Sequence, residues 1–116
     1  MIKVRVKRDK GGNPLSVEIK GHALFAPRGR DIVCAAVSAL AQTTLYALED
    51  LVGIKPSVHM AEGYLLIAAP PLMMDREQKE KYCLLMETML LGLKETAKAY
   101  PEHLSFKTFI SREIMI

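Results

Sequence analysis

Hydrophobic and polar residues alternate in two short segments near the start of the chain. In residues 2–8 apolar side chains alternate with basic ones, and residues 15–20 repeat the alternation. A period of two is typical of a strand with one buried face. Residues 9–14 read Asp-Lys-Gly-Gly-Asn-Pro, which is the composition of a turn, so the two segments predict a β-hairpin.

The polar side of this hairpin is basic. It carries Lys3, Arg5, Lys7 and Lys20. Two interpretations stay open at this point. The first is a solvated sheet surface, and the second is a contact surface for an acidic partner.

Two longer segments have the periodicity of helices. The first begins at Asp31 and runs to Val52, with Gly53 as its C-terminal stop, and the second runs from Asp75 to Tyr100. One broad face of the first helix is predicted to hold Ile32, Ala35, Ala36, Ala39, Leu40 and Thr43. The apolar face of the second is predicted to hold Tyr82, Leu85, Met86, Met89, Leu90 and Leu93.

Three further strands complete the predicted fold. Residues 57–61 and 64–69 are apolar runs joined by Glu62-Gly63, which predicts a second hairpin, and residues 106–110 predict a last strand. Both helices need a sheet face to bury against. The order ββαββαβ therefore predicts an α+β fold, a two-layer sandwich with a mainly antiparallel sheet and two helices on one face. At 116 residues, we expect a single domain spanning residues 1–116.

Composition narrows the class of protein. The net charge of +3 is compatible with work near RNA but does not argue for it. The N-terminal residues lack the apolar core of a signal peptide, and the apolar stretch Ile32–Ala41 is shorter than the roughly 20 residues of a membrane span. We therefore expect a cytoplasmic protein with no membrane contact, whose two cysteines are free thiols.

One segment combines groups that carry chemistry. His22 lies at the end of a predicted strand, Cys34 lies in the first turn of a predicted helix, and a loop joins them. Asp31 is placed as the N-cap of that helix. The first-turn N–H groups and the helix macrodipole favour a thiolate at Cys34, and His22 is the histidine placed to supply an imidazolium partner. The same amides are candidates for an oxyanion hole.

Each of these roles has a plainer alternative. A cysteine in a helix rich in alanine and valine usually behaves as a small buried hydrophobe. Strict alternation would point His22 away from the helices, so Gly21 must break the strand register for the pair to form. Asp31 either orients His22 or, as a cap, places an anion near the thiolate and opposes its ionisation. Ser38, one turn beyond Cys34, either bonds near the thiol or bonds back to its own helix.

Gly29 and Cys83 are the remaining candidate residues. Gly29 gives the loop freedom to close over a bound peptide. Cys83, on the second helix, is expected to be structural. The chain has no Cys-x-x-Cys or His-x-x-x-His spacing, so we expect neither a metal nor a cofactor.

The segment around these residues resembles a known signature. It reads Gly21-His22-Ala23, then Gly29-x-Asp31-Ile32-Val33-Cys34-Ala35-Ala36-Val37-Ser38, and is similar to the motif of the bacterial ribosomal-processing cysteine proteases. The resemblance covers about 18 of 116 residues and is specific in residue type and spacing. It implies that Cys34 is the nucleophile and His22 its base, with Asp31 and Ser38 in supporting positions.

The resemblance also implies a substrate and an assembly. The expected substrate is the precursor of a large-subunit ribosomal protein, number twenty-seven, whose N-terminal extension is cleaved after a phenylalanine during ribosome assembly. Phe25 and Leu24 are alternative candidates to line the apolar slot for that side chain. A homodimer working close to the ribosome is implied as well.

An alternative belongs to another class of function. The chain would be a non-catalytic ribosome-associated or RNA-binding module. It would use the basic surface of Lys3, Arg5 and Lys7, and Cys34 would merely be packed.

Overall fold

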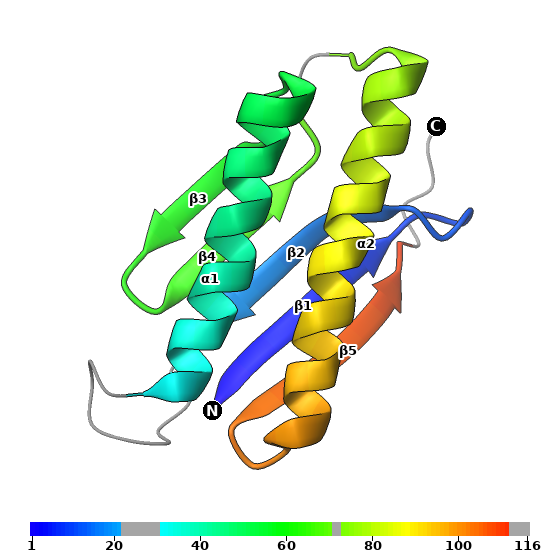
Figure 1. Ribbon diagram of the computed structural model, residues 1–116. Helices are drawn as coiled ribbons and strands as arrows, with labels where there is room; N and C mark the ends of the chain where they lie inside the picture. The colour runs from blue at the N-terminus through cyan, green and yellow to red at the C-terminus, as the bar shows by residue number, and fades with distance from the viewer. Residues whose placement is uncertain (22–30, 71–72, 112–116) are drawn as a thin grey trace.

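The computed structural model describes residues 1–21, 31–70 and 73–111. Its elements are the strands β1 (Ile2–Arg8) and β2 (Pro14–Lys20), the helix α1 (Ile32–Ala47) with a π-helical continuation η1 (Leu48–Val52), the strands β3 (Ser57–Ala61) and β4 (Tyr64–Ala68), the helix α2 (Arg76–Ala99) and the strand β5 (Leu104–Ile110). Both helices lie on one face of a five-stranded sheet (Figure 1). The predicted α+β class is confirmed, although the last strand begins two residues earlier than predicted.

The sheet is mainly antiparallel, with strand order β3-β4-β2-β1-β5. β2 pairs antiparallel with both β1 and β4, whereas β5 pairs parallel with β1. A parallel pair needs a crossover connection, and the chain from β4 through α2 brings β5 to the far side of β1. In the β1–β2 register Val4 lies opposite Ile19 and Val6 opposite Val17, so the apolar residues of both strands share the helix-covered face.

The buried side of α1 differs from the predicted one. The residues that it buries against the sheet, with one from η1, are Val33, Val37, Ala41, Thr44 and Leu48. The predicted face is largely exposed, at Ile32, Ala35, Ala36, Ala39 and Thr43. The helix is apolar on nearly every side, so periodicity alone does not single out one stripe. The predicted core of α2 is confirmed at Tyr82, Met86, Met89, Leu90 and Leu93.

The first helix runs without interruption through η1. It ends at Gly53, whose φ of 76° is left-handed, and the Ile54 N–H donates to the Leu48 carbonyl at 3.0 Å. Among the described residues, Ile32–Val52 is long and apolar enough to cross a membrane. The expectation based on the stretch Ile32–Ala41 alone therefore underestimated the length of this apolar segment. Such a segment is weak evidence for a membrane span, because the core helix of a soluble protein has the same length and composition, and this helix packs on the sheet.

Candidate active site

Asp31 caps the helix that carries Cys34. Its backbone is extended (φ −78°, ψ 107°), and its Oδ1 accepts the N–H groups of Val33 and Cys34, both at 3.0 Å. The Asp31 carbonyl accepts the Ala35 N–H at 3.0 Å, which begins the helical ladder. The predicted N-cap is confirmed, and Cys34 lies in the first turn of α1 with its side chain half-buried.

The cap changes what the first-turn amides can do. The Val33 and Cys34 N–H groups were candidates for an oxyanion hole, but in this structure both donate to Asp31. Both amides are therefore engaged by the cap, because a carboxylate at the N-cap competes for the same donors, and the oxyanion-hole role stays a prediction. The Ile32 N–H takes part in neither of these two capping bonds. The carboxylate also brings a negative charge to the helix end whose amides carry partial positive charge.

A cavity of about 250 Å³ opens beside Cys34, where α1 meets the β3–β4 hairpin and the end of β2. Cys34, Ser38 and Gln42 line it from one face of α1, and Gly21 lines it from the end of β2. The structure thus brings together three residues that the sequence predicted, namely Gly21, Cys34 and Ser38. Most other side chains in the wall are apolar, which makes the cavity suited to an apolar side chain of a peptide.

Gly21 ends the strand alternation. Its φ is 99°, which L side chains rarely adopt, and its N–H donates to the Gly63 carbonyl at 2.8 Å. A Cβ at this position would overlap the carbonyl oxygen of Met1. The register therefore breaks at Gly21, as the sequence required. His22 itself, with Phe25 and Gly29, lies outside the described residues, and the roles of all three stay predictions.

Several cavity residues were not anticipated from the sequence. Gln42 follows Cys34 by two helical turns, so the spacing Cys34, Ser38, Gln42 was a usable signal. Met60 and Leu65 come from the β3–β4 hairpin. They reach the cavity because β4 pairs with β2, which places Leu65 opposite Ile19. No local pattern encodes that pairing.

The second thiol lies elsewhere. Cys83 on α2 is half-buried, and its Sγ lies 3.9 Å from the Asn13 Oδ1 at the β1–β2 turn. Burial raises the pKa of the Cys83 thiol, which keeps it protonated and poorly nucleophilic. Within residues 1–21, 31–70 and 73–111, no three His, Cys, Asp or Glu side chains gather closely enough to hold a metal ion.

The chain is similar to known proteins over nearly its whole length. The family model described as Cysteine protease Prp matches residues 1–105. The ribosomal processing cysteine protease Prp of Bacillus subtilis is 34% identical over 112 residues, which cover 95% of this chain and 99% of that relative.

Solved structures share the fold. A crystal structure of a Streptococcus mutans protein has a TM-score of 0.83 at 38% identity and covers 96% of both chains. The ribosomal processing protease Prp from Staphylococcus aureus, in complex with a covalently linked product peptide, has a TM-score of 0.84 at 25% identity. That match covers 94% of this chain and 100% of the other, so the likeness includes the helix and hairpin that form the cavity.

Proposed function

This chain belongs to the Prp family of ribosomal processing cysteine proteases, and from that premise we propose that it removes the N-terminal extension of large-subunit ribosomal protein number twenty-seven, cleaving after a phenylalanine. The observation that carries the proposal is the placement of Cys34, at the start of α1 and on the wall of an apolar cavity. The family is one of cysteine proteases, so we set aside the alternative of a non-catalytic module.

The proposed nucleophile is Cys34 and the proposed base is His22. His22 takes the thiol proton, and the sulfur attacks the carbonyl carbon of the scissile bond. The tetrahedral intermediate collapses to a thioester as His22 gives the proton to the leaving amine, and water then hydrolyses the thioester. The covalently linked product peptide of the Staphylococcus aureus relative supports a covalent route.

Asp31, Ser38 and Gly21 have supporting roles in this proposal. Asp31 fixes the first turn of α1, and with it the backbone of Cys34, through its two capping bonds. Ser38 lines the same cavity as Cys34 and offers a hydroxyl to the bound peptide backbone. Gly21 permits the turn that leads the chain from β2 toward His22. Phe25 and Gly29 are proposed to contact the peptide.

The cavity is the proposed slot for the phenylalanine that precedes the scissile bond. Its apolar walls include side chains from all the elements that meet there, namely Ile19, Val37, Ala41, Met60 and Leu65. Complete burial of a phenylalanine side chain stabilises a complex by about 1.5–3 kcal/mol. An apolar slot beside the nucleophile would therefore select the cleavage position.

The proposal extends to the assembly. We infer a cytoplasmic homodimer that works close to the ribosome as one domain of residues 1–116, without a metal or a cofactor. The outer side of the first helix supports self-association, since it exposes apolar side chains at Ile32, Tyr46 and Leu51 that a second copy can cover. Analytical ultracentrifugation of the protein and of Tyr46→Glu tests this, because a monomeric wild type contradicts the dimer.

Mass spectrometry of the extended ribosomal protein after incubation with the enzyme tests the proposed reaction. We expect a single cut after a phenylalanine. Cys34→Ser and His22→Ala should abolish it, whereas Cys83→Ala, the matched thiol variant, should cleave at the wild-type rate. Undiminished cleavage by Cys34→Ser would contradict the mechanism, and loss confined to Cys83→Ala would show that the wrong thiol had been assigned.

A further inference from the structure

The sheet face opposite the helices is strongly basic. The residues that share it, which we call the cationic face, are Lys3, Arg5 and Lys7 of β1, Lys20 of β2 and Lys107 of β5. Among the described strand residues, this face carries one carboxylate, Glu18, which lies 3.9 Å from Arg5 and accepts the Tyr64 hydroxyl at 3.0 Å. Positive charge is therefore concentrated on the side of the sheet away from Cys34.

Two pairs of like charges face each other across neighbouring strands. Lys3 lies opposite Lys20 in the β1–β2 register, and Arg5 lies beside Lys107 in the β1–β5 register. Like charges in directly opposed positions destabilise a sheet. An anionic ligand bound on this face would reduce the repulsion between these like charges. Local arrangements that lower stability in this way are typical of functional surfaces.

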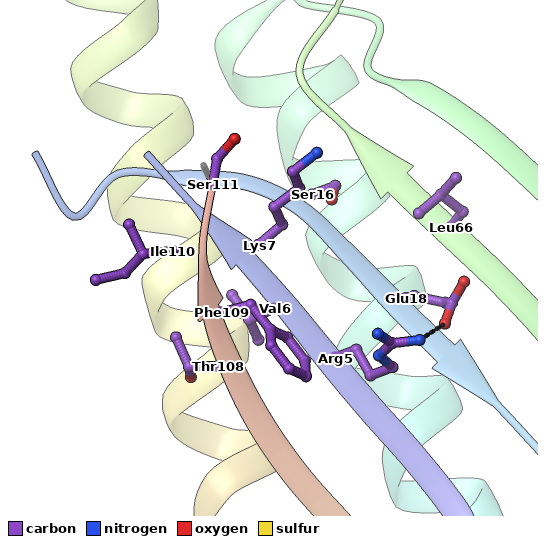
Figure 2. Close-up of a pocket in the computed structure, with 10 residues that line it drawn as sticks. All are labelled: Arg5, Val6, Lys7, Ser16, Glu18, Leu66, Thr108, Phe109, Ile110 and Ser111. Carbon is purple, nitrogen blue, oxygen red and sulfur yellow. Dashed lines mark ion pairs between the residues drawn. The ribbon is translucent and has the colours of Figure 1, made fainter. Parts of the chain in front are cut away.

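The cationic face also has a hollow and an aromatic ring. A shallow depression of about 1010 Å³ lies over β1, β2 and β5, and its lining includes Arg5, Lys7, Ser16 and Phe109. Figure 2 shows the Phe109 ring beside the Arg5 side chain, which extends toward Glu18. The Arg5 guanidinium lies 5.0 Å from the ring centroid, and 43% of Phe109 is exposed. A ring held in this way offers a stacking surface to a base.

We propose that the cationic face binds single-stranded RNA through its phosphate backbone, with Phe109 stacking on a base. Side chains two residues apart on a strand are about 6.5–7 Å apart, comparable to the spacing of successive phosphates on an extended strand. Lys3, Arg5 and Lys7 therefore present a row of cations along β1. Since peptide cleavage is assigned to the helix-covered side, the two ligands do not compete for space.

RNA is favoured over an acidic protein for two reasons. An acidic protein segment would match the cations but would have no use for an exposed aromatic ring in the hollow. RNA uses both, because sheets that bind single strands combine cations with aromatic stacking. Relatives of the chain are also named for ribosomal processing, and a ribosomal setting would supply RNA as a ligand.

Fluorescence anisotropy with a labelled single-stranded 20-nucleotide RNA tests the proposal. Affinity should fall with salt between about 50 and 200 mM, with a log–log slope of roughly −2 to −3.5 for three to five neutralised phosphates. Lys3→Gln/Lys107→Gln should weaken binding at least about tenfold at low salt and reduce the slope by about 1.4. The matched control, Lys55→Gln/Lys94→Gln, removes the same charge from exposed positions outside the cationic face and should stay within about twofold.

Stability separates a binding role from a structural one. Removing Lys3 and Lys107 relieves both like-charge pairs, so the thermal midpoint of the double variant should equal or exceed that of the wild type. A lower midpoint would overturn the argument from repulsion. Absence of RNA binding by the wild type, equal losses in the two double variants, or binding of poly-glutamate in preference to RNA would each overturn the proposal.

Discussion

The Asp31 carboxylate accepts the backbone N–H of Cys34 at 3.0 Å, so the helix cap and the proposed nucleophile share one hydrogen bond. Asp31→Ala removes two capping bonds and should lower the free energy of unfolding by about 1 kcal/mol. Asp31→Asn keeps an amide oxygen that can cap and should stay close to the wild type. Urea unfolding checks both, and equal losses in the two variants would show that the charge, not the cap geometry, carries the stability.

The same pair of variants reports on the thiol. Asp31→Asn removes a negative charge next to Cys34 while the cap is kept, so alkylation of Cys34 by iodoacetamide at neutral pH should become several-fold faster. Peptide mapping distinguishes Cys34 from Cys83. A slower reaction of Cys34 in Asp31→Asn would show that the carboxylate assists the sulfur.

Gly21 should be intolerant of a side chain. Its φ of 99° costs an alanine about 1–2 kcal/mol, and the new Cβ would overlap the Met1 carbonyl oxygen. We expect Gly21→Ala to lose more than about 2 kcal/mol of stability and most of its peptidase activity. Gly12→Ala is the matched control, because its φ of 88° is similar but its Cβ meets open space. Similar thermal midpoints in the two variants would show that the overlap is relieved without cost.

Tyr82 should destabilise the protein at alkaline pH. Its side chain is 1% exposed, its hydroxyl has no hydrogen-bond partner among the described residues, and burial raises its pKa from 10.0 to about 12. The unfolded chain therefore ionises first as the pH rises, and stability present below pH 10 is lost up to about pH 12, by about 2–3 kcal/mol. Tyr82→Phe should remove this loss and gain about 1 kcal/mol at neutral pH.

Urea unfolding between pH 7 and 12 measures this effect. Tyr46→Phe serves as the control, since Tyr46 is 64% exposed within a single copy of the chain and lies outside its core. An unchanged alkaline decline in Tyr82→Phe would assign the loss to another group.

Met60 should contribute to selection of the cleavage site. It lines the cavity beside Cys34 while 66% of it stays exposed, so truncation should not disturb the core. A sulfur–aromatic contact contributes about 0.3–1.5 kcal/mol, so Met60→Ala should raise KM for a phenylalanine-containing peptide by about two- to tenfold. Steady-state kinetics should show kcat nearly unchanged. Met73→Ala, a truncation at a 99% exposed position, should leave both constants unaltered.

The sequence anticipated the features that local chemistry determines. Alternation located β1 and β2, Asp31 was recognisable as a cap, and Gly21 was required to break the strand. The sheet-facing stripe of α1 was assigned wrongly because the helix is apolar on several sides, so tertiary packing decides which stripe is buried. Met60 and Leu65 were missed because strand pairing across more than 40 residues brings them to Cys34. The bonds from the Val33 and Cys34 amides to Asp31 follow from its N-cap position, so their engagement was also predictable from the sequence.

The parallel pairing of β1 with β5 bears on how the protein is made. β1 is among the first segments to be synthesised, yet one of its edges stays open until residues 104–110 emerge and pair with it. Pairing so distant in sequence slows folding, and an open strand edge invites association with other chains. A nascent chain must therefore keep β1 shielded through nearly its whole synthesis, and a chain that stops before Leu104 leaves that edge exposed.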